Sequence, residues 1–177
     1  TDSAFDLQAA GSGIRCYYGG FTASGSELSV KSAKTALNVR ESQSCHISSS
    51  EVTLESAEES AVIVDAKELR ITGSKLTASS AGSSEAALYV SGDGNLIIED
   101  LSGSPSEVRI TSENAQGIFC AGDITVTGSK AEITAQRTGI QAGGAVDLEK
   151  SEMTVEAGWT GIQAGGAVNL KNSDVAA

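Results

Sequence analysis

The stretch Thr138 to Val146 reads TGIQAGGAV, and Thr160 to Val168 repeats it letter for letter. Working outward from these copies, a serine falls at the matching place in seven successive segments of roughly 22 to 30 residues each. The seven serines are Ser26, Ser50, Ser74, Ser106, Ser129, Ser151 and Ser173. Repeats of this length bury their apolar side chains only by stacking on one another, which predicts a solenoid.

Each segment contains three short runs in which apolar and other residues alternate with period two, the signature of β-strands. In the sixth segment the inward-facing pairs are Ile140 with Ala142, Val146 with Leu148, and Met153 with Val155. No helical periodicity accompanies them. We therefore predict an all-β fold, a single-stranded parallel β-helix with three strands per coil and about seven coils. Because parallel crossovers are overwhelmingly right-handed, we expect a right-handed helix.

The repeat domain is expected to span residues 13–177, with residues 1–12 as a lead-in in which Phe5 and Leu7 cap the first coil. The seventh coil reaches Ala177 without a comparable cap, so we expect its open edge to continue into further chain or to be covered by self-association. The fourth coil is the longest. Its extra residues, near Asp100 to Ser106, predict a loop that leaves the solenoid.

Composition limits the classes of partner. The formal net charge is -11, and the 12 basic residues are scattered, whereas a nucleic-acid surface needs clustered Lys and Arg. We therefore expect no nucleic-acid partner and no binding to anionic membrane surfaces. No apolar run is long enough to span a bilayer, so no membrane insertion is expected. A chain that begins at Thr1 is typical of a processed secreted protein or of a shortened sequence.

The three cysteines, Cys16, Cys45 and Cys120, form no CxxC pair. Cys16 and Cys120 lie on inward positions four coils apart, much farther than the roughly 7 Å that a disulfide allows. We expect all three to be small buried hydrophobic residues. No metal site and no cofactor is predicted.

Two motifs carry a family resemblance: GIFCAGDITVTGSKAEITA at Gly117 to Ala135, and GIQAGGAVDLEKSEMTVEA at Gly139 to Ala157. With them the chain resembles bacterial secreted proteins described as carbohydrate-binding-domain or right-handed β-helix proteins of the cell surface, many from gut-dwelling Gram-positive bacteria. The resemblance covers residues 13–177. It implies a β-helix, an extracellular or cell-surface location and carbohydrate binding, and it brings no catalytic site with it.

Outward positions on the first strand of each coil supply the candidate site. In order they are Arg15, Asn38, Ile63, Tyr89, Phe119, Gln141 and Gln163. Ile63, Tyr89 and Phe119 fall in consecutive coils and should form one apolar strip, a feature typical of contact surfaces. We expect Tyr89 and Phe119 to stack on sugar rings, and the four polar members to bond the ligand. Alternatively, the fourth-coil loop or a neighbouring domain covers the strip.

An enzyme acting on polysaccharides is the rival reading. Glycoside hydrolysis needs two carboxyl groups about 5 to 10 Å apart. The aspartates lie mostly in or beside corners, without a paired Asp–Asp motif: Asp65, Asp93, Asp100, Asp123 and Asp147. His46, the sole histidine, occupies an outward position on a second strand and is expected to be solvated. We predict no catalytic residues.

A second outward column, at the start of the third strands, is charged. Its members are Glu27, Glu51, Lys75, Glu107, Lys130, Glu152 and Asp174. Like charges on neighbouring strands repel, so we expect Lys75 and Lys130 to neutralise the carboxylates beside them. A calcium ion between Glu27 and Glu51 is the alternative, without the Asp-rich loop of a dedicated site.

Together these observations predict a non-catalytic extracellular module for adhesion or carbohydrate binding, with a glycan or a host or cell-surface protein as partner. The alternatives are a structural spacer in a larger surface protein and, less favoured by the residues, a polysaccharide lyase or hydrolase.

Overall fold

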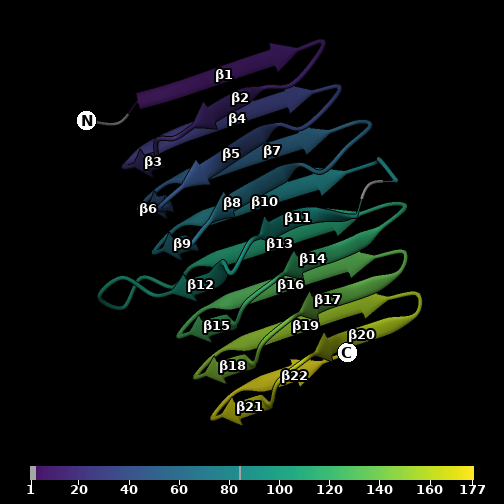
Figure 1. The fold of residues 1–177 in the computed structure, drawn as a ribbon. Helices are drawn as coiled ribbons and strands as arrows, with labels where there is room; N and C mark the ends of the chain where they lie inside the picture. The colour runs from purple at the N-terminus through teal and green to yellow at the C-terminus, as the bar shows by residue number, and fades with distance from the viewer. Residues whose placement is uncertain (1–2, 84) are drawn as a thin grey trace.

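The computed structural model describes residues 3–83 and 85–177, and it is a β-solenoid built from three parallel sheets (Figure 1). Successive strands pass from one sheet to the next, so each coil contributes one strand to each sheet. This confirms the predicted parallel β-helix of three strands per coil and about seven coils. The described residues contain no helix of the length and apolarity needed to cross a membrane.

Sheet A collects the third strands. It comprises β1 (Ser3–Ala9), β4 (Ser26–Ser32), β7 (Glu51–Ser56), β10 (Lys75–Ser80), β13 (Glu107–Ser112), β16 (Lys130–Ala135), β19 (Glu152–Ala157) and β22 (Asp174–Ala176). Sheet B collects the first strands. It comprises β2 (Ile14–Tyr17), β5 (Leu37–Ser42), β8 (Val62–Ala66), β11 (Ala86–Ser91), β14 (Gln116–Cys120), β17 (Thr138–Ala142) and β20 (Thr160–Ala164).

Sheet C collects the second strands. It comprises β3 (Phe21–Ser24), β6 (Cys45–Ser48), β9 (Glu68–Thr72), β12 (Asn95–Glu99), β15 (Ile124–Thr127), β18 (Val146–Glu149) and β21 (Val168–Lys171).

The core consists of aliphatic columns that run through the stacked coils. In sheet B the register pairs Ile14 with Leu37, Leu37 with Val62, and so on in the predicted order to Ile162. The members in the middle coils are buried, whereas Ile14 and Ile162 at the two ends are only partly buried. A side chain in an end coil lacks a neighbouring coil on one side, and this accounts for the difference.

The recurrent serines form a hydrogen-bonded ladder along the corner between sheets C and A. The backbone N–H of Ser50 donates to Oγ of Ser74 (3.2 Å), and the same bond links each of the seven serines to the next, at 3.1–3.3 Å. Oγ of Ser74 in turn donates to the carbonyl of Thr72 (2.8 Å). From Ser50 to Ser173 each hydroxyl therefore gives a partner to one backbone N–H of the preceding coil, and it adds a second bond to a carbonyl that already accepts from a backbone N–H.

The residue before the serine adopts the left-handed backbone conformation in six of these turns. These residues are Gly25, Ser49, Gly73, Gly128, Lys150 and Asn172. The fourth coil differs, because Pro105 precedes Ser106 and proline cannot take a positive φ. There Ser106 Oγ donates to the carbonyl of Glu99 (2.7 Å), across the inserted loop. The hydroxyl thus keeps its role although the chain between the two groups is longer.

The inserted loop was predicted near Asp100 to Ser106, and it projects from that corner (Figure 1). It closes on itself through two backbone bonds between Leu101 and Ser104, at 2.8 and 3.0 Å. A Cβ on Gly73 would lie 2.6 Å from Cβ of Leu101, so the loop packs against the turn of the preceding coil. Gly73 is therefore needed both for its φ of 52° and for this close approach.

The lead-in contributes a strand to the solenoid. Within residues 1–12, of which 1 and 2 lie outside the described residues, β1 pairs with β4 along its whole length. Phe5 and Leu7 take the register of the inward residues Leu28 and Val30. Phe5 is 55% exposed. The repeat pattern therefore begins earlier than the sequence motif indicated, and β1 pairs with β4 and becomes the edge strand of sheet A.

At the other end, the inward-facing Val168 and Leu170 of the last coil are about half exposed. Strands β20, β21 and β22 each have a neighbour on one side only. Self-association through this coil stays a prediction.

All three cysteines are free thiols, and Cys45 and Cys120 are buried as predicted. The prediction that Cys16 is buried was wrong: it is only partly buried, because its coil is the first of the stack. Burial raises the pKa of the Cys45 thiol to about 12 and that of Cys120 to about 11. Both side chains thus remain protonated and act as small apolar residues of the core.

Candidate functional site

The candidate row lies on the outer face of sheet B, with its members on adjacent strands in the predicted order. Tyr89 is the cross-strand partner of Ile63 on one side and of Phe119 on the other. These three side chains are partly exposed, so the fourth-coil loop, at the corner between sheets C and A, does not cover them. The predicted apolar strip is therefore a real feature of the surface.

Tyr89 and Phe119 stack on each other. Their ring centroids are 4.8 Å apart and their planes differ by 13°. At this centroid distance the two rings cannot lie edge to edge in one plane, because their atoms would overlap. The rings are therefore stacked with one face of each against the other. Ile63 borders the far side of Tyr89, and Gln141 that of Phe119. The expected stacking of sugars on these rings therefore lacks open ring faces, and what the strip offers a ligand is mainly ring edges.

A shallow depression of about 390 Å³ lies beside Tyr89. Its lining residues are Arg40, Ser60, Ile63, Asp65, Glu85, Tyr89 and Ser91. Ile63 and Tyr89 provide apolar surface, and the other residues provide hydrogen-bonding groups. Burial, and then a hydrogen bond to the Glu85 carboxylate, raise the pKa of Tyr89 above its ordinary value. Tyr89 therefore stays a neutral phenol.

A β-bulge shapes the same place. Val39 pairs with Val64 and Ser42 with Ala66, so Arg40 and Glu41 together face the single residue Asp65. Glu41 has a φ of 52° and is, among the described residues, the one non-glycine residue inside a strand with a positive φ. Bulges re-aim side chains and are common beside functional sites, and such backbone strain persists only where the surroundings enforce it.

The charged residues of sheet B are unpaired. Arg15, Arg40, Glu41 and Asp65 lie on its strands, and none of them takes part in an ion pair between described residues. Arg40 and Asp65 line one depression without bonding each other. The Nε of Arg40 donates to Oδ1 of Asn38 (3.0 Å), which leaves the two terminal nitrogens without a protein partner in the described chain.

The polar members of the predicted row have different positions. Asn38 is buried and holds Arg40, so it positions another residue and has little surface to offer a ligand. Arg15 is exposed and donates to Ser12 Oγ (2.6 Å). Gln141 and Gln163 continue the row beyond Phe119, away from the depression.

Several residues that line the depression were not predicted from the sequence. Arg40, Asp65 and Ser91 stand two positions after Asn38, Ile63 and Tyr89, on the next outward slot of the same strands. The period-two pattern could have identified them. Glu85 comes from the turn before β11, and the bulge at Arg40 has no sequence signal that we recognise.

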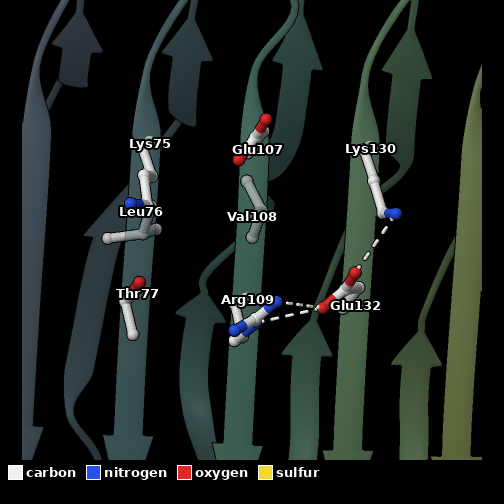
Figure 2. Close-up of a pocket in the computed structure, with 8 residues that line it drawn as sticks. All are labelled: Lys75, Leu76, Thr77, Glu107, Val108, Arg109, Lys130 and Glu132. Carbon is white, nitrogen blue, oxygen red and sulfur yellow. Dashed lines mark hydrogen bonds and ion pairs between the residues drawn. The ribbon is translucent and has the colours of Figure 1, made fainter.

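Sheet A carries a second hollow, of about 320 Å³, over β10, β13 and β16 (Figure 2). Arg109 donates to Glu132 through Nε (3.0 Å) and Nη2 (2.6 Å), and Lys130 lies 3.3 Å from the same carboxylate. These contacts, with Arg109 first, lower the pKa of Glu132. The cations that line this hollow are already in ion pairs with carboxylates, so they are not free to bind a ligand.

The predicted charged column of sheet A is in register, and its lysines neutralise their neighbours. Lys75 Nζ lies 2.9 Å from Glu51, and Lys130 Nζ lies 3.4 Å from Glu152. Glu27 and Glu51 are also cross-strand partners. No group of three or more metal-ligating side chains occurs among residues 3–83 and 85–177.

His46 is outward-facing on sheet C, as predicted, but it is paired. Its Nε2 lies 2.9 Å from Oε1 of Glu68, and Arg70 joins Glu68 to Glu99. The contact with Arg70, ahead of that with His46, lowers the pKa of Glu68. Sheet C therefore resembles sheet A in having its basic side chains joined to carboxylates.

Comparison of the chain with known protein families, with curated proteins and with solved structures finds no match in any of the three.

Proposed function

We propose that the chain is a non-catalytic, extracellular module that binds a glycan in the depression on sheet B and so serves adhesion. The observation that carries this proposal is the unpaired state of Arg40 and Asp65 beside the apolar wall of Ile63 and Tyr89. The resemblance of the motifs at Gly117 to Ala135 and Gly139 to Ala157 to those of bacterial secreted proteins supports the extracellular location in this proposal.

The chemistry of the depression suits a sugar. A hydroxyl group both donates and accepts hydrogen bonds, and sugars carry several around one ring. The Asp65 carboxylate accepts from hydroxyls and the terminal nitrogens of Arg40 donate to them, as charge-assisted bonds. Ile63 and the edge of Tyr89 can meet the C–H groups of the same ring. A shallow, mixed surface of this kind fits a hydroxyl-rich ligand better than a purely apolar one.

The test is a glycan array probed with the wild-type chain and with Asp65→Asn, which keeps the shape of the side chain and removes its charge. Loss of a hydrogen bond to a charged group is worth about 1.5–3 kcal/mol, so we expect affinity to fall at least about tenfold. Asp147→Asn, on the outer face of sheet C, is the matched control and should bind as the wild type does.

A double variant, Tyr89→Ala with Phe119→Ala, should also lose binding because it removes Tyr89 from the apolar wall together with the Phe119 ring that stacks on it. Absence of any retained glycan, or equal binding by Asp65→Asn and wild type, would overturn the proposal and leave a spacer as the better description. Urea unfolding of each variant separates lost binding from lost folding.

A further inference from the structure

Tyr17 is an exposed aromatic residue at the border of the depression. It is the last residue of β2, and the register makes it the cross-strand partner of Arg40. It is 52% exposed. Arg40 lines the depression, so Tyr17 lies on the strand next to one of the lining residues.

The ring of Tyr17 is free in a way that the rings of the apolar strip are not. Tyr89 and Phe119 cover each other. Tyr17 makes no ring-stacking or cation–π contact with any described residue. An aromatic face that is open to solvent is the surface on which an apolar face of a ligand ring can stack.

Tyr17 pairs with Arg40 across β2 and β5, and Asp65 pairs with Ser91 across β8 and β11. At the bulge between these pairs Arg40 and Glu41 together face Asp65, so the four residues form one column with a bulge at its centre. Neighbouring strands are about 4.8 Å apart, so the three intervals span roughly 14 Å along the solenoid axis. A sugar unit in an extended chain is comparable in length to one interval. The column therefore offers an aromatic platform at one end and hydrogen-bonding groups at the spacing of successive sugar rings.

Charge indicates the class of sugar. The charged groups at this face are the cations Arg15 and Arg40 and the anions Glu41, Asp65 and Glu85, within a chain of net charge -11. Such a face has no excess of cations with which to attract carboxylate or sulfate groups. It suits a neutral chain.

We infer that the ligand is a linear, neutral oligosaccharide of about three units that lies along the solenoid axis, with its terminal ring stacked on Tyr17. This inference rests on the proposed glycan-binding function and adds the direction, length and charge of the ligand. Tyr17 sets the minimum length, because a single sugar held at Asp65 and Ser91 lies at least two strand spacings, roughly 10 Å, from Tyr17.

The experiment titrates the chain by calorimetry with cello-, xylo-, chito- and malto-oligosaccharides of one to six units, and with oligogalacturonides as the acidic series. Affinity for one neutral series should rise up to about the trimer and then level off. Tyr17→Ala should weaken trimer binding about three- to tenfold, the worth of an aromatic contact. It should leave binding of the monosaccharide unchanged.

Tyr18→Ala is the matched control, since Tyr18 is adjacent in sequence and 79% exposed but lies in the turn after β2. It should bind all lengths as the wild type does. If no glycan binds the wild type, the proposed function itself fails. If a glycan binds but the monomer binds as tightly as the trimer, if Tyr17→Ala is silent, or if only the acidic series binds, the proposed function stands and this inference is overturned.

Discussion

Ser129 shows how much of the corner depends on a single hydroxyl. It is 4% exposed, accepts from the backbone N–H of Ser106 (3.2 Å) and donates to the carbonyl of Thr127 (2.9 Å). Without it the carbonyl of Thr127 keeps its bond from the backbone N–H of Asp100 (3.1 Å), but the N–H of Ser106 stays buried and unpaired. Such groups are costly because they lose their bonds to water and receive nothing in exchange.

We expect Ser129→Ala to lower the free energy of unfolding by about 1–3 kcal/mol. Urea denaturation followed by circular dichroism measures this change. Ser79→Ala is the control, because Ser79 faces outward on β10 and is partly exposed. Equal stability of the two variants would show that the ladder contributes nothing beyond the turns themselves.

Glu68 is the second residue with a measurable role, through its contacts with Arg70 and His46. Its pKa is lowered in the folded chain from an ordinary value of 4.5. A lowered pKa contributes stability above the unfolded pKa, and this contribution is lost as the pH falls through the lower folded value. The loss therefore begins near pH 4.5 and proceeds toward more acidic pH.

Glu68→Gln should therefore be less stable than wild type at pH 7, by no more than about 1 kcal/mol because the pair is partly exposed. The gap should narrow as the pH falls below 4.5. Urea unfolding at several pH values measures it, with the exposed Glu156→Gln on β19 as control. A gap that is constant with pH would mean that the substitution acts through shape rather than charge.

At the scale of elements, the inserted loop is an addition to a standard turn. Ser106 bonds the carbonyl of Glu99 just as Ser74 bonds that of Thr72, where Gly73 alone separates the two. Replacing Asp100 to Pro105 by one glycine recreates the shorter turn.

This replacement should change the free energy of unfolding by less than about 1 kcal/mol, because the bonds at both ends are retained and loop length has a small effect on stability. Thermal and urea unfolding measure it. Glycan binding should be unchanged, because the loop lies at the corner between sheets C and A, whereas the proposed binding site lies on sheet B. A large loss of stability would show that packing of Leu101 on the Gly73 turn stabilises the fold.

The elements were more predictable than the site. Period-two alternation identified the strands and the order of the Ile63, Tyr89 and Phe119 row. Coils that stack in register place equivalent residues on neighbouring strands, so the order of the row follows from the repeat. The alternation could not reveal that Tyr89 and Phe119 cover each other, because it predicts which face of the sheet a side chain is on but not how neighbouring rings are oriented. The bulge at Arg40 was also hidden, because two residues opposing one is a property of a pair of strands. The strand β1 was missed because it lacks the preceding part of the repeat.

For the whole molecule, stability should decline toward the ends, since each coil is held by its neighbours. The cysteines report this. Cys16 lies in the first coil and is partly exposed, whereas Cys120 is buried in a middle coil. We expect a thiol reagent to modify Cys16 first and Cys45 and Cys120 only on deeper unfolding. Mass spectrometry of peptides identifies the order, and modification of all three at one rate would indicate unfolding in a single step.

The serine ladder also has a direction. From Ser50 to Ser173 each hydroxyl accepts a backbone hydrogen from the coil before it and donates its own hydrogen to a carbonyl of its own turn, so the small dipoles point the same way along the corner. An additional coil inserted between two coils would preserve this alignment of dipoles only if it also had a serine at the corner between sheets C and A. The ladder therefore sets the rule by which a protein of this design can be lengthened.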